Sequence, residues 1–211
     1  MTHFVVLVAG ASDVPAVREV MTRRFELTED VHFRIHPHQG KGRLPTNPLA
    51  RPDLRPRQLR HQWPAKLRGH GKSLAPDAVV LVVIDTDDVP CTALLADLNA
   101  MLASLPVRPS RVLFRLTIEE TESWFVADPE AVKSAFPKAS VAALKKIQPD
   151  AIVGAWERLA EAIGAPTRSS GSDKLRWAAQ ICPHLDLDTP KSPSLGKLIS
   201  AVARELQADK A

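Results

Sequence analysis

Cysteine, tyrosine and long apolar runs are scarce or missing in this chain of 211 residues, which holds two cysteines and no tyrosine. Cys91 and Cys182 have neither the spacing of a metal site nor the number needed for a disulfide framework, so we interpret both as buried thiols. No run of about 18 apolar residues is available to span a membrane, and the first apolar segment is too short for a signal peptide. We therefore expect a cytoplasmic protein without membrane contact.

Acidic residues are nearly missing from the segment between Arg34 and Lys72. Ten Lys and Arg residues stand there against a single acid, Asp53, so this segment carries +9, whereas the rest of the chain carries −5. A basic patch of this size favours a polyanionic partner, because each neutralised phosphate releases counterions. The segment 34–72 therefore predicts binding to DNA or RNA. A solvated surface loop is the alternative interpretation.

Four segments are predicted as strands, and two of them, which contain VVLV and AVVLVVI, are almost entirely apolar. Such runs are typical of parallel strands covered on both faces. The predicted strands are Phe4–Ala9, Val31–His36, Ala78–Asp85 and Arg111–Thr117. Helices are predicted over 13–25, 56–68, 89–104, 141–146, 150–163 and 172–181, with further helix starts at Asp128-Pro129 and Ser192-Pro193. This alternation predicts an α/β fold with a doubly wound parallel sheet of about four strands and a helical C-terminal extension.

Two aspartates, Asp85 and Asp87, follow the third predicted strand in the stretch VVLVVIDTDD. Residues i and i+2 of an extended chain point the same way, so both carboxylates can face one spot. Converging carboxylates suit a hard divalent ion such as Mg²⁺. The competing interpretation is that these acids form a turn and cap the following helix; it accounts well for Asp88.

Three glutamates, Glu119, Glu120 and Glu122, follow the fourth predicted strand. On a helix starting there, Glu119 and Glu122 would share a face, but acids at a helix N-terminus are also favoured by the helix dipole alone. Asp13, after the first strand, is a weaker candidate, because capping of the following helix explains it.

Six stretches of the chain, in order, resemble a family of small Toprim-fold proteins. They are VLVAGASDVPAVREV, IHPHQGKGRL, VVLVVIDTDD, IEETESWFVADPEAV, KLRWAAQICPHLD and KSPSLGKLI. That family is mostly of unknown function and is often encoded beside AAA or ABC-type ATPases. Its fold is shared by topoisomerases, primases and nucleases of the overcoming-lysogenization-defect type. The resemblance implies a Toprim-like (Rossmann-like) catalytic domain over 1–136, with a basic insertion at 37–76, and a helical extension over 137–211 packed on the same domain.

The Toprim pattern has a glutamate followed by glycine after the first strand and Asp-x-Asp after a later one. Gly10, Asp85 and Asp87 match this pattern, whereas Ala9 occupies the slot of the glutamate. A methyl group can neither bind a metal nor transfer a proton. The resemblance thus implies a chain inactivated at Ala9, either by an introduced Glu→Ala change or by natural loss; the intact remaining motifs favour the former.

The resemblance also implies a metal-dependent nuclease that uses Mg²⁺ or Mn²⁺. The expected metal ligands are Asp85, Asp87, Glu119 and Glu122, and the expected substrate contacts are Lys41, Arg43 and His38. Lys41 lies between two glycines in QGKGR, where a flexible backbone allows close approach to a phosphate. A solvated lysine and a structural histidine are the alternatives for Lys41 and His38.

By analogy, such a nuclease would be an effector in an ATPase-linked anti-phage or toxin system, with an AAA or ABC-type ATPase as partner. A non-catalytic nucleic-acid-binding or regulatory subunit is the main alternative. A phosphatase of the haloacid dehalogenase type is a third, because Asp85 to Val89 resembles its motif, although that family places the motif on its first strand. The choice between DNA and RNA, and whether the chain forms a homodimer, stay open.

Overall fold

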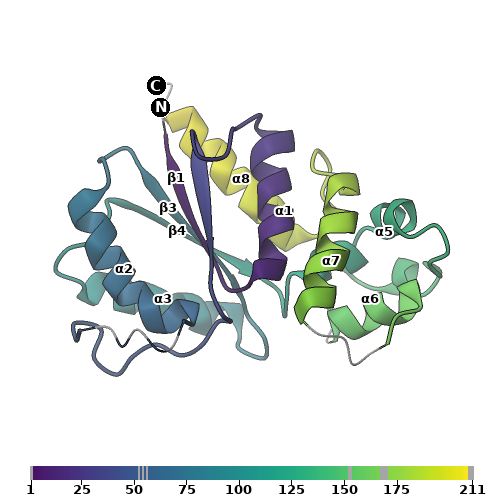
Figure 1. Cartoon of the computed structure of the whole chain (residues 1–211), viewed down its shortest axis with the longest axis horizontal. Coiled ribbons are helices and arrows are strands. Elements are labelled where there is room, and N and C mark those ends of the chain that lie inside the picture. The colour runs from purple at the N-terminus through teal and green to yellow at the C-terminus, as the bar shows by residue number, and fades with distance from the viewer. Residues whose placement is uncertain are drawn as a thin grey trace.

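Four parallel strands form one sheet in the order β2-β1-β3-β4 in the computed structural model (Figure 1). The strands are β1 (Phe4–Val8), β2 (Phe33–Pro37), β3 (Val79–Asp85) and β4 (Arg111–Thr117). The structure describes residues 2–51, 53, 55, 57–151, 154–166 and 171–208. The predicted α/β class and parallel sheet are confirmed, and the arrangement is consistent with a Toprim-like or Rossmann-like fold.

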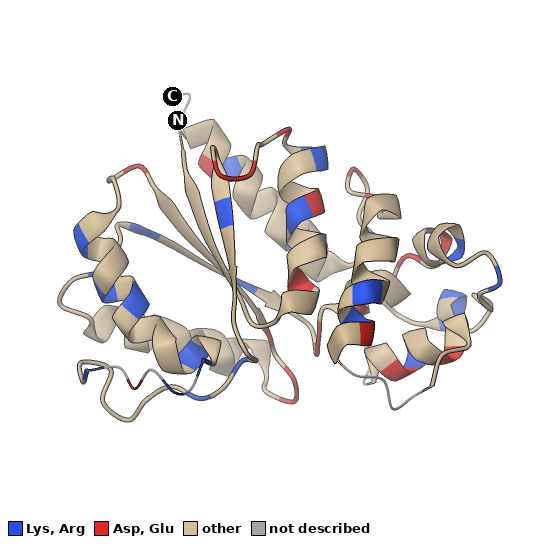
Figure 2. Cartoon of the chain, viewed as in Figure 1, with Lys and Arg blue, Asp and Glu red and all other residues tan. Residues whose placement is uncertain are grey.

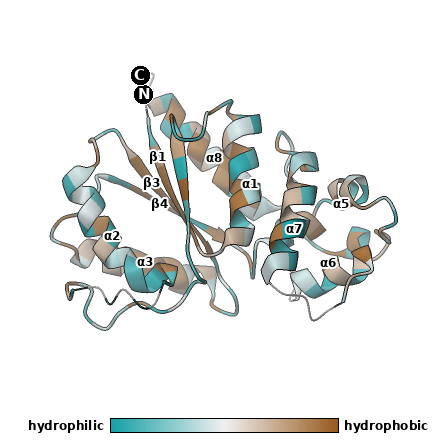
Figure 3. Ribbon diagram, in the orientation of Figure 1, coloured by the Kyte–Doolittle hydropathy of each residue, from teal (hydrophilic) through white to brown (hydrophobic). Residues whose placement is uncertain are grey.

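Both faces of the central strands are buried, which explains their continuous apolar sequence. On β3, Val79, Leu81 and Val83 belong to one core cluster. The alternate residues of β3 join a second cluster on the opposite face. Hydrophobic residues concentrate on these strands in Figure 3. The sheet is therefore the middle layer of three, as expected for a doubly wound fold.

The two faces are covered by different parts of the chain. Helices α2 (Leu59–Ser73) and α3 (Cys91–Ser104) cover one face through residues such as Trp63 and Leu94. The opposite face is covered by α1 (Val14–Glu19), which continues as a π-helical turn, and by C-terminal helices. Because β1 leads to β2 on one side and β3 lies on its other side, the chain changes direction between β1 and β3. In open α/β sheets, ligands bind at the carboxyl ends of the strands at such a point.

The C-terminal part is helical and returns to the sheet at its end. Its elements are α4 (Glu122–Val126), α5 (Pro129–Ala135), α6 (Ala155–Ile163), α7 (Gly171–Ile181) and α8 (Pro193–Ala208). Trp177 of α7 and Leu198 of α8 share the core cluster of α1 and β1. Helix α8 lies along β4, where Arg111 forms an ion pair with Glu205. Within the described residues, none of the helices is both long and apolar enough to cross a membrane.

Several predicted element bounds differ from the structure because local backbone conformation decides them. The second strand begins at Phe33 rather than Val31, since Asp30 has a positive φ of 64° in the preceding turn. The helix predicted over 150–163 begins at Ala155, after Gly154 with a φ of 80°. The helix predicted over 141–146 is only a 3-10 turn at 144–146, and that over 56–68 runs from Leu59 to Ser73. Parts of the predicted segments 1–136, 34–72, 37–76, 56–68, 137–211 and 150–163 lie outside the described residues.

Candidate active site at the carboxyl ends of β1 and β3

A cavity of about 1100 Å³ opens at the carboxyl ends of β1 and β3, where the chain changes direction. The loop after β2 forms its second side. Acidic residues from the strand ends and basic residues from this loop and α2 face each other across it. The lining includes Ala9, Gly10, Asp13, Lys41, Arg43, Arg60, His61, Asp85, Asp87 and Asp88.

Asp13 lies buried at the acidic side of the cavity. Its Oδ2 accepts a hydrogen bond from the Gly10 N–H at 2.7 Å, and its Oδ1 accepts one from the Thr121 hydroxyl at 2.9 Å. It thus reaches back to cap the turn that starts at Gly10, and makes no side-chain cap for α1 itself. Burial raises the pKa of Asp13, although these hydrogen bonds and Lys174 oppose the rise. Asp13, the weaker candidate in the sequence, is therefore central to the site.

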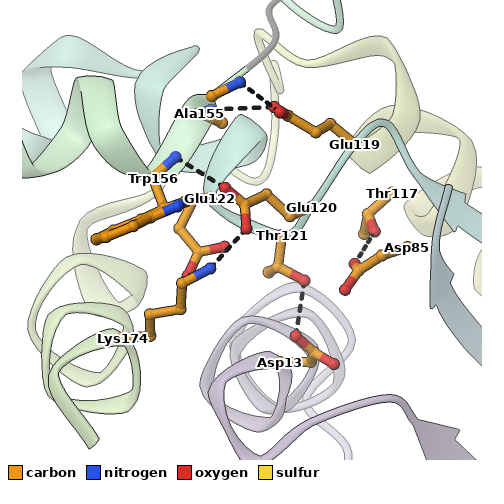
Figure 4. A network of polar contacts seen from close by, with 11 residues as sticks. Asp13, Asp85, Thr117, Glu119, Glu120, Thr121, Glu122, Ala155, Trp156 and Lys174 are labelled. Carbon is orange, nitrogen blue, oxygen red and sulfur yellow. Dashed lines mark hydrogen bonds and ion pairs between the residues drawn. The ribbon is translucent and has the colours of Figure 1, made fainter. Parts of the chain in front are cut away.

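Asp85 ends β3 beside Asp13 and is held by the neighbouring strand. The β3–β4 register pairs it with Thr117, whose hydroxyl donates to Asp85 Oδ1 (Figure 4). Burial raises the pKa of Asp85 well above its ordinary value, and the charges of Asp13 and Glu122 raise it further. A second charge of the same sign in this space is costly, so these carboxyls favour protonation or a cation.

Glu122, the first residue of α4, is the third carboxyl of this cluster and is buried. Its Oε1 has no hydrogen-bond partner among the described residues, and the Lys174 Nζ lies 3.7 Å away. Lys174 instead donates to Glu120 at 2.6 Å, and the Trp156 N–H donates to the same carboxylate at 2.9 Å. Burial raises the pKa of Glu122 to about 7, although Lys174 opposes the rise. Glu122 thus titrates near neutral pH, the range suited to proton transfer.

The opposite wall of the cavity is basic. Lys41 lies between Gly40 and Gly42, which have φ values of 91° and 65°, so the turn needs glycine at both positions. The Lys41 ammonium pairs with Asp87 and donates to the Thr86 carbonyl at 3.3 Å. Figure 2 shows Lys and Arg residues along this loop and α2. Arg43 and Arg60 line the cavity without an ion-pair partner in the described part of the chain.

Two of the expected metal ligands are engaged elsewhere. The Glu119 carboxylate accepts hydrogen bonds from the Gly154 and Ala155 N–H groups, so it caps the start of α6 and lies apart from Asp85 (Figure 4). Asp87 lines the cavity, but its side chain is 60% exposed and paired with Lys41. The structure thus groups Asp85 with Asp13 and Glu122. Asp87 stays close to Asp85 but pairs with Lys41, whereas Glu119 is held away at the start of α6.

The remaining predicted residues divide between the cavity and the core. Ala9 is buried against the cavity at the tip of β1, where the Toprim resemblance implies a glutamate. His38 is buried and its Nδ1 lies 2.9 Å from the Val8 carbonyl, which fits the structural interpretation rather than substrate contact. Burial also lowers the pKa of His38, so this imidazole favours the neutral form.

The donors fit a hard divalent cation by their chemistry. Glu122 offers a buried carboxylate oxygen without a hydrogen bond, and Thr117 occupies only one oxygen of Asp85. Carboxylate oxygens are the ligands that Mg²⁺ prefers. Across the ranges that the structure describes, however, no group of three or more acidic, histidine or cysteine side chains is arranged to hold a metal ion as it stands.

Several functional contacts were not predicted. Thr117 and Thr121 orient Asp85 and Asp13, and Arg60 joins the basic wall from α2. The sequence carries a signal only for Thr117, which ends a strand next to β3 in the predicted sheet. Lys174 lies far along the chain from the glutamates it neutralises, so only the tertiary fold identifies its role.

A model of the family described as a domain of unknown function (DUF4276) matches residues 10–203. Because the match spans most of the chain, the protein belongs to this family. Searches of curated proteins and of solved structures gave no match to the chain.

Proposed function

We propose that this DUF4276 protein binds a phosphate-containing polymer in the cavity at the carboxyl ends of β1 and β3. We further propose that this site, with an acid in place of Ala9, supports metal-dependent phosphodiester hydrolysis. The observation that carries the proposal is the meeting of two acids, buried Asp13 and half-buried Asp85, with basic Lys41, Arg43 and Arg60 across one cavity. The basic wall would hold phosphate oxygens, while the acids would hold Mg²⁺ or Mn²⁺. The nuclease relationship to Toprim proteins is part of this proposal.

A divalent ion bound in such a site polarises a phosphoryl oxygen and lowers the pKa of a bound water. Asp85, with Asp13 and Glu122, would be the residues to hold it. Lys41 is already positioned by Asp87 and the Thr86 carbonyl, so it can orient a phosphate with little loss of side-chain freedom. Glu122, with a pKa of about 7, can hold or release a proton at its Oε1 near neutral pH.

A non-catalytic nucleic-acid-binding or regulatory subunit is the second candidate. Ala9 supplies no acid at the tip of β1, and the described acids form no ready-made metal cluster. The basic wall would serve such a subunit equally well. Partnership with an AAA or ABC-type ATPase is part of the proposal under either candidate.

A cleavage and binding experiment separates the two candidates. The chain and its Ala9→Glu variant are each incubated with plasmid DNA, single-stranded DNA and total tRNA, in Mg²⁺, Mn²⁺ or EDTA. Asp85→Asn in the Ala9→Glu background tests the site, and Asp97→Asn, an exposed carboxylate of α3, is the matched control.

Metal-dependent cleavage by Ala9→Glu that is lost in Asp85→Asn but kept in Asp97→Asn supports the nuclease proposal. Salt-sensitive binding without cleavage by any variant supports the binding subunit. Absence of both binding and cleavage contradicts the proposal of a phosphate-polymer site.

A further inference from the structure

A groove of about 500 Å³ lies at the β4 edge of the sheet, the edge opposite β2. It runs along β4, between α3 and α8, and combines apolar side chains such as Leu95 and Phe114 with basic ones. Strand β4 ends the sheet and pairs only with β3 among the described strands. An open edge of this kind is a template for another strand.

The backbone groups that β4 presents to the groove follow from its register. The Thr117 carbonyl accepts from the Thr86 N–H at 3.0 Å, so Thr117 faces β3. Successive residues of a strand point their N–H and C=O groups to opposite sides, so Phe114 and Leu116 present theirs to the open edge. The Arg115 guanidinium covers this edge at one point, because it donates to the Phe114 carbonyl at 2.5 Å.

The charge along the groove is positive on balance, with three cations and one acid, Asp150, in its lining. Arg115, Lys197 and Arg204 line it, and none of them forms an ion pair with another described residue. Glu205, which acts on Arg115, pairs with Arg111, and Asp150 is held by hydrogen bonds from serines at the start of α8, so neither acid forms an ion pair with the three cations. Burial and the nearby Arg204 also lower the pKa of Arg115, although Glu205 opposes this.

The two sides of the groove differ in chemistry. The α3 side is apolar, because Phe114 and Leu116 pack with α3 in one core cluster. The α8 side is basic, because Lys197 and Arg204 are exposed there on one helix face. A strand added to β4 would direct alternate side chains to these two sides. Its sequence should therefore alternate acidic and apolar residues.

We propose that the open edge of β4 binds an extended acidic peptide segment of a partner protein by strand addition. Backbone hydrogen bonds to the Phe114 N–H and to Leu116 would supply affinity, and pairing of its acids with Arg115, Lys197 and Arg204 would select the segment. A second copy of this chain is a poorer occupant, because edge-to-edge pairing would bring two sets of three cations together.

The probe is a labelled peptide as long as β4 that alternates glutamate and valine, titrated with the full chain at low ionic strength by fluorescence anisotropy. The proposal expects saturable binding that weakens by about tenfold or more in the double variant Lys197→Glu/Arg204→Glu, because two attractive contacts become repulsive. Lys138→Glu/Lys146→Glu makes the same change in net charge at exposed positions away from the groove, and should bind as the parent does.

Methylation of the peptide amides that face β4 should weaken binding without any change in charge. Equal binding by the double variant and the parent, or by the methylated and plain peptides, would overturn the proposal. A chain that sediments as a dimer and binds no peptide would assign the edge to a second copy and would also overturn it.

Discussion

Replacement of Glu122 by glutamine should stabilise the folded chain at alkaline pH. Glu122 is 3% exposed, and its pKa rises from 4.5 to about 7 on folding. At 1.36 kcal/mol for each pKa unit, ionisation of the folded carboxyl costs about 3 kcal/mol relative to the unfolded chain. Glutamine keeps the shape and removes this cost, while Lys174 retains Glu120 as its partner at 2.6 Å.

The raised pKa of Glu122 makes the free energy of unfolding fall as pH rises. Below pH 4.5 the carboxyl is protonated in both states and contributes its full stability. As pH rises toward 7, the unfolded chain ionises first, so the parent loses stability that the variant keeps. In urea denaturation without divalent metal, the parent and Glu122→Gln should have nearly equal free energies of unfolding below pH 4.5. Above pH 7, the variant should be more stable by about 2–3 kcal/mol.

Glu157→Gln, at an exposed position of α6, is the matched control and should leave the profile unchanged. A Glu122→Gln variant that is no more stable than the parent above pH 7 would refute the assignment of Glu122 as a buried carboxyl with a raised pKa.

Three further results are expected. Mg²⁺ at a hundredfold excess over its Kd should stabilise the parent by about 2.7 kcal/mol, seen as a rise in Tm in a thermal scan. Asp85→Asn should abolish this rise. An equal rise in both proteins would mean that the ion binds elsewhere. Lys41→Ala/Arg43→Ala should weaken binding to tRNA or single-stranded DNA and reduce the slope of log affinity against log salt by roughly 1–2. The exposed control Lys138→Ala should leave both unchanged. An unchanged slope in the double variant would contradict the proposal that the basic wall binds phosphates. Gly71→Ala should destabilise the fold by about 1–3 kcal/mol in urea denaturation, since a Cβ there would lie 2.6 Å from the Arg108 backbone; a neutral effect would mean that these segments do not approach so closely.

The predictions that held depended on signals local in the chain. Continuous apolar runs at β1 and β3 predict buried parallel strands, because only covered faces tolerate them. Asp128-Pro129 predicts a helix start, and the Asp128 side chain does accept from the Ala131 N–H. The helix predicted to start near Asp150 begins later. The Asp150 carboxylate instead accepts a hydrogen bond from the Ser194 N–H, far along the chain, and the positive φ of Gly154 separates Asp150 from α6.

The sequence by itself determined the parallel α/β sheet, the basic segment 34–72 and the placement of Asp85 at a strand end. Only the tertiary structure decided which acids share that space. Asp13 and Glu122 meet Asp85 because α1 and α4 both begin beside the end of β3, whereas Glu119 turns away to the unpaired N–H groups of α6. Spacing along the chain specifies which way a side chain points from its own element. Burial and competing hydrogen-bond donors from distant elements determine where its charge is finally held.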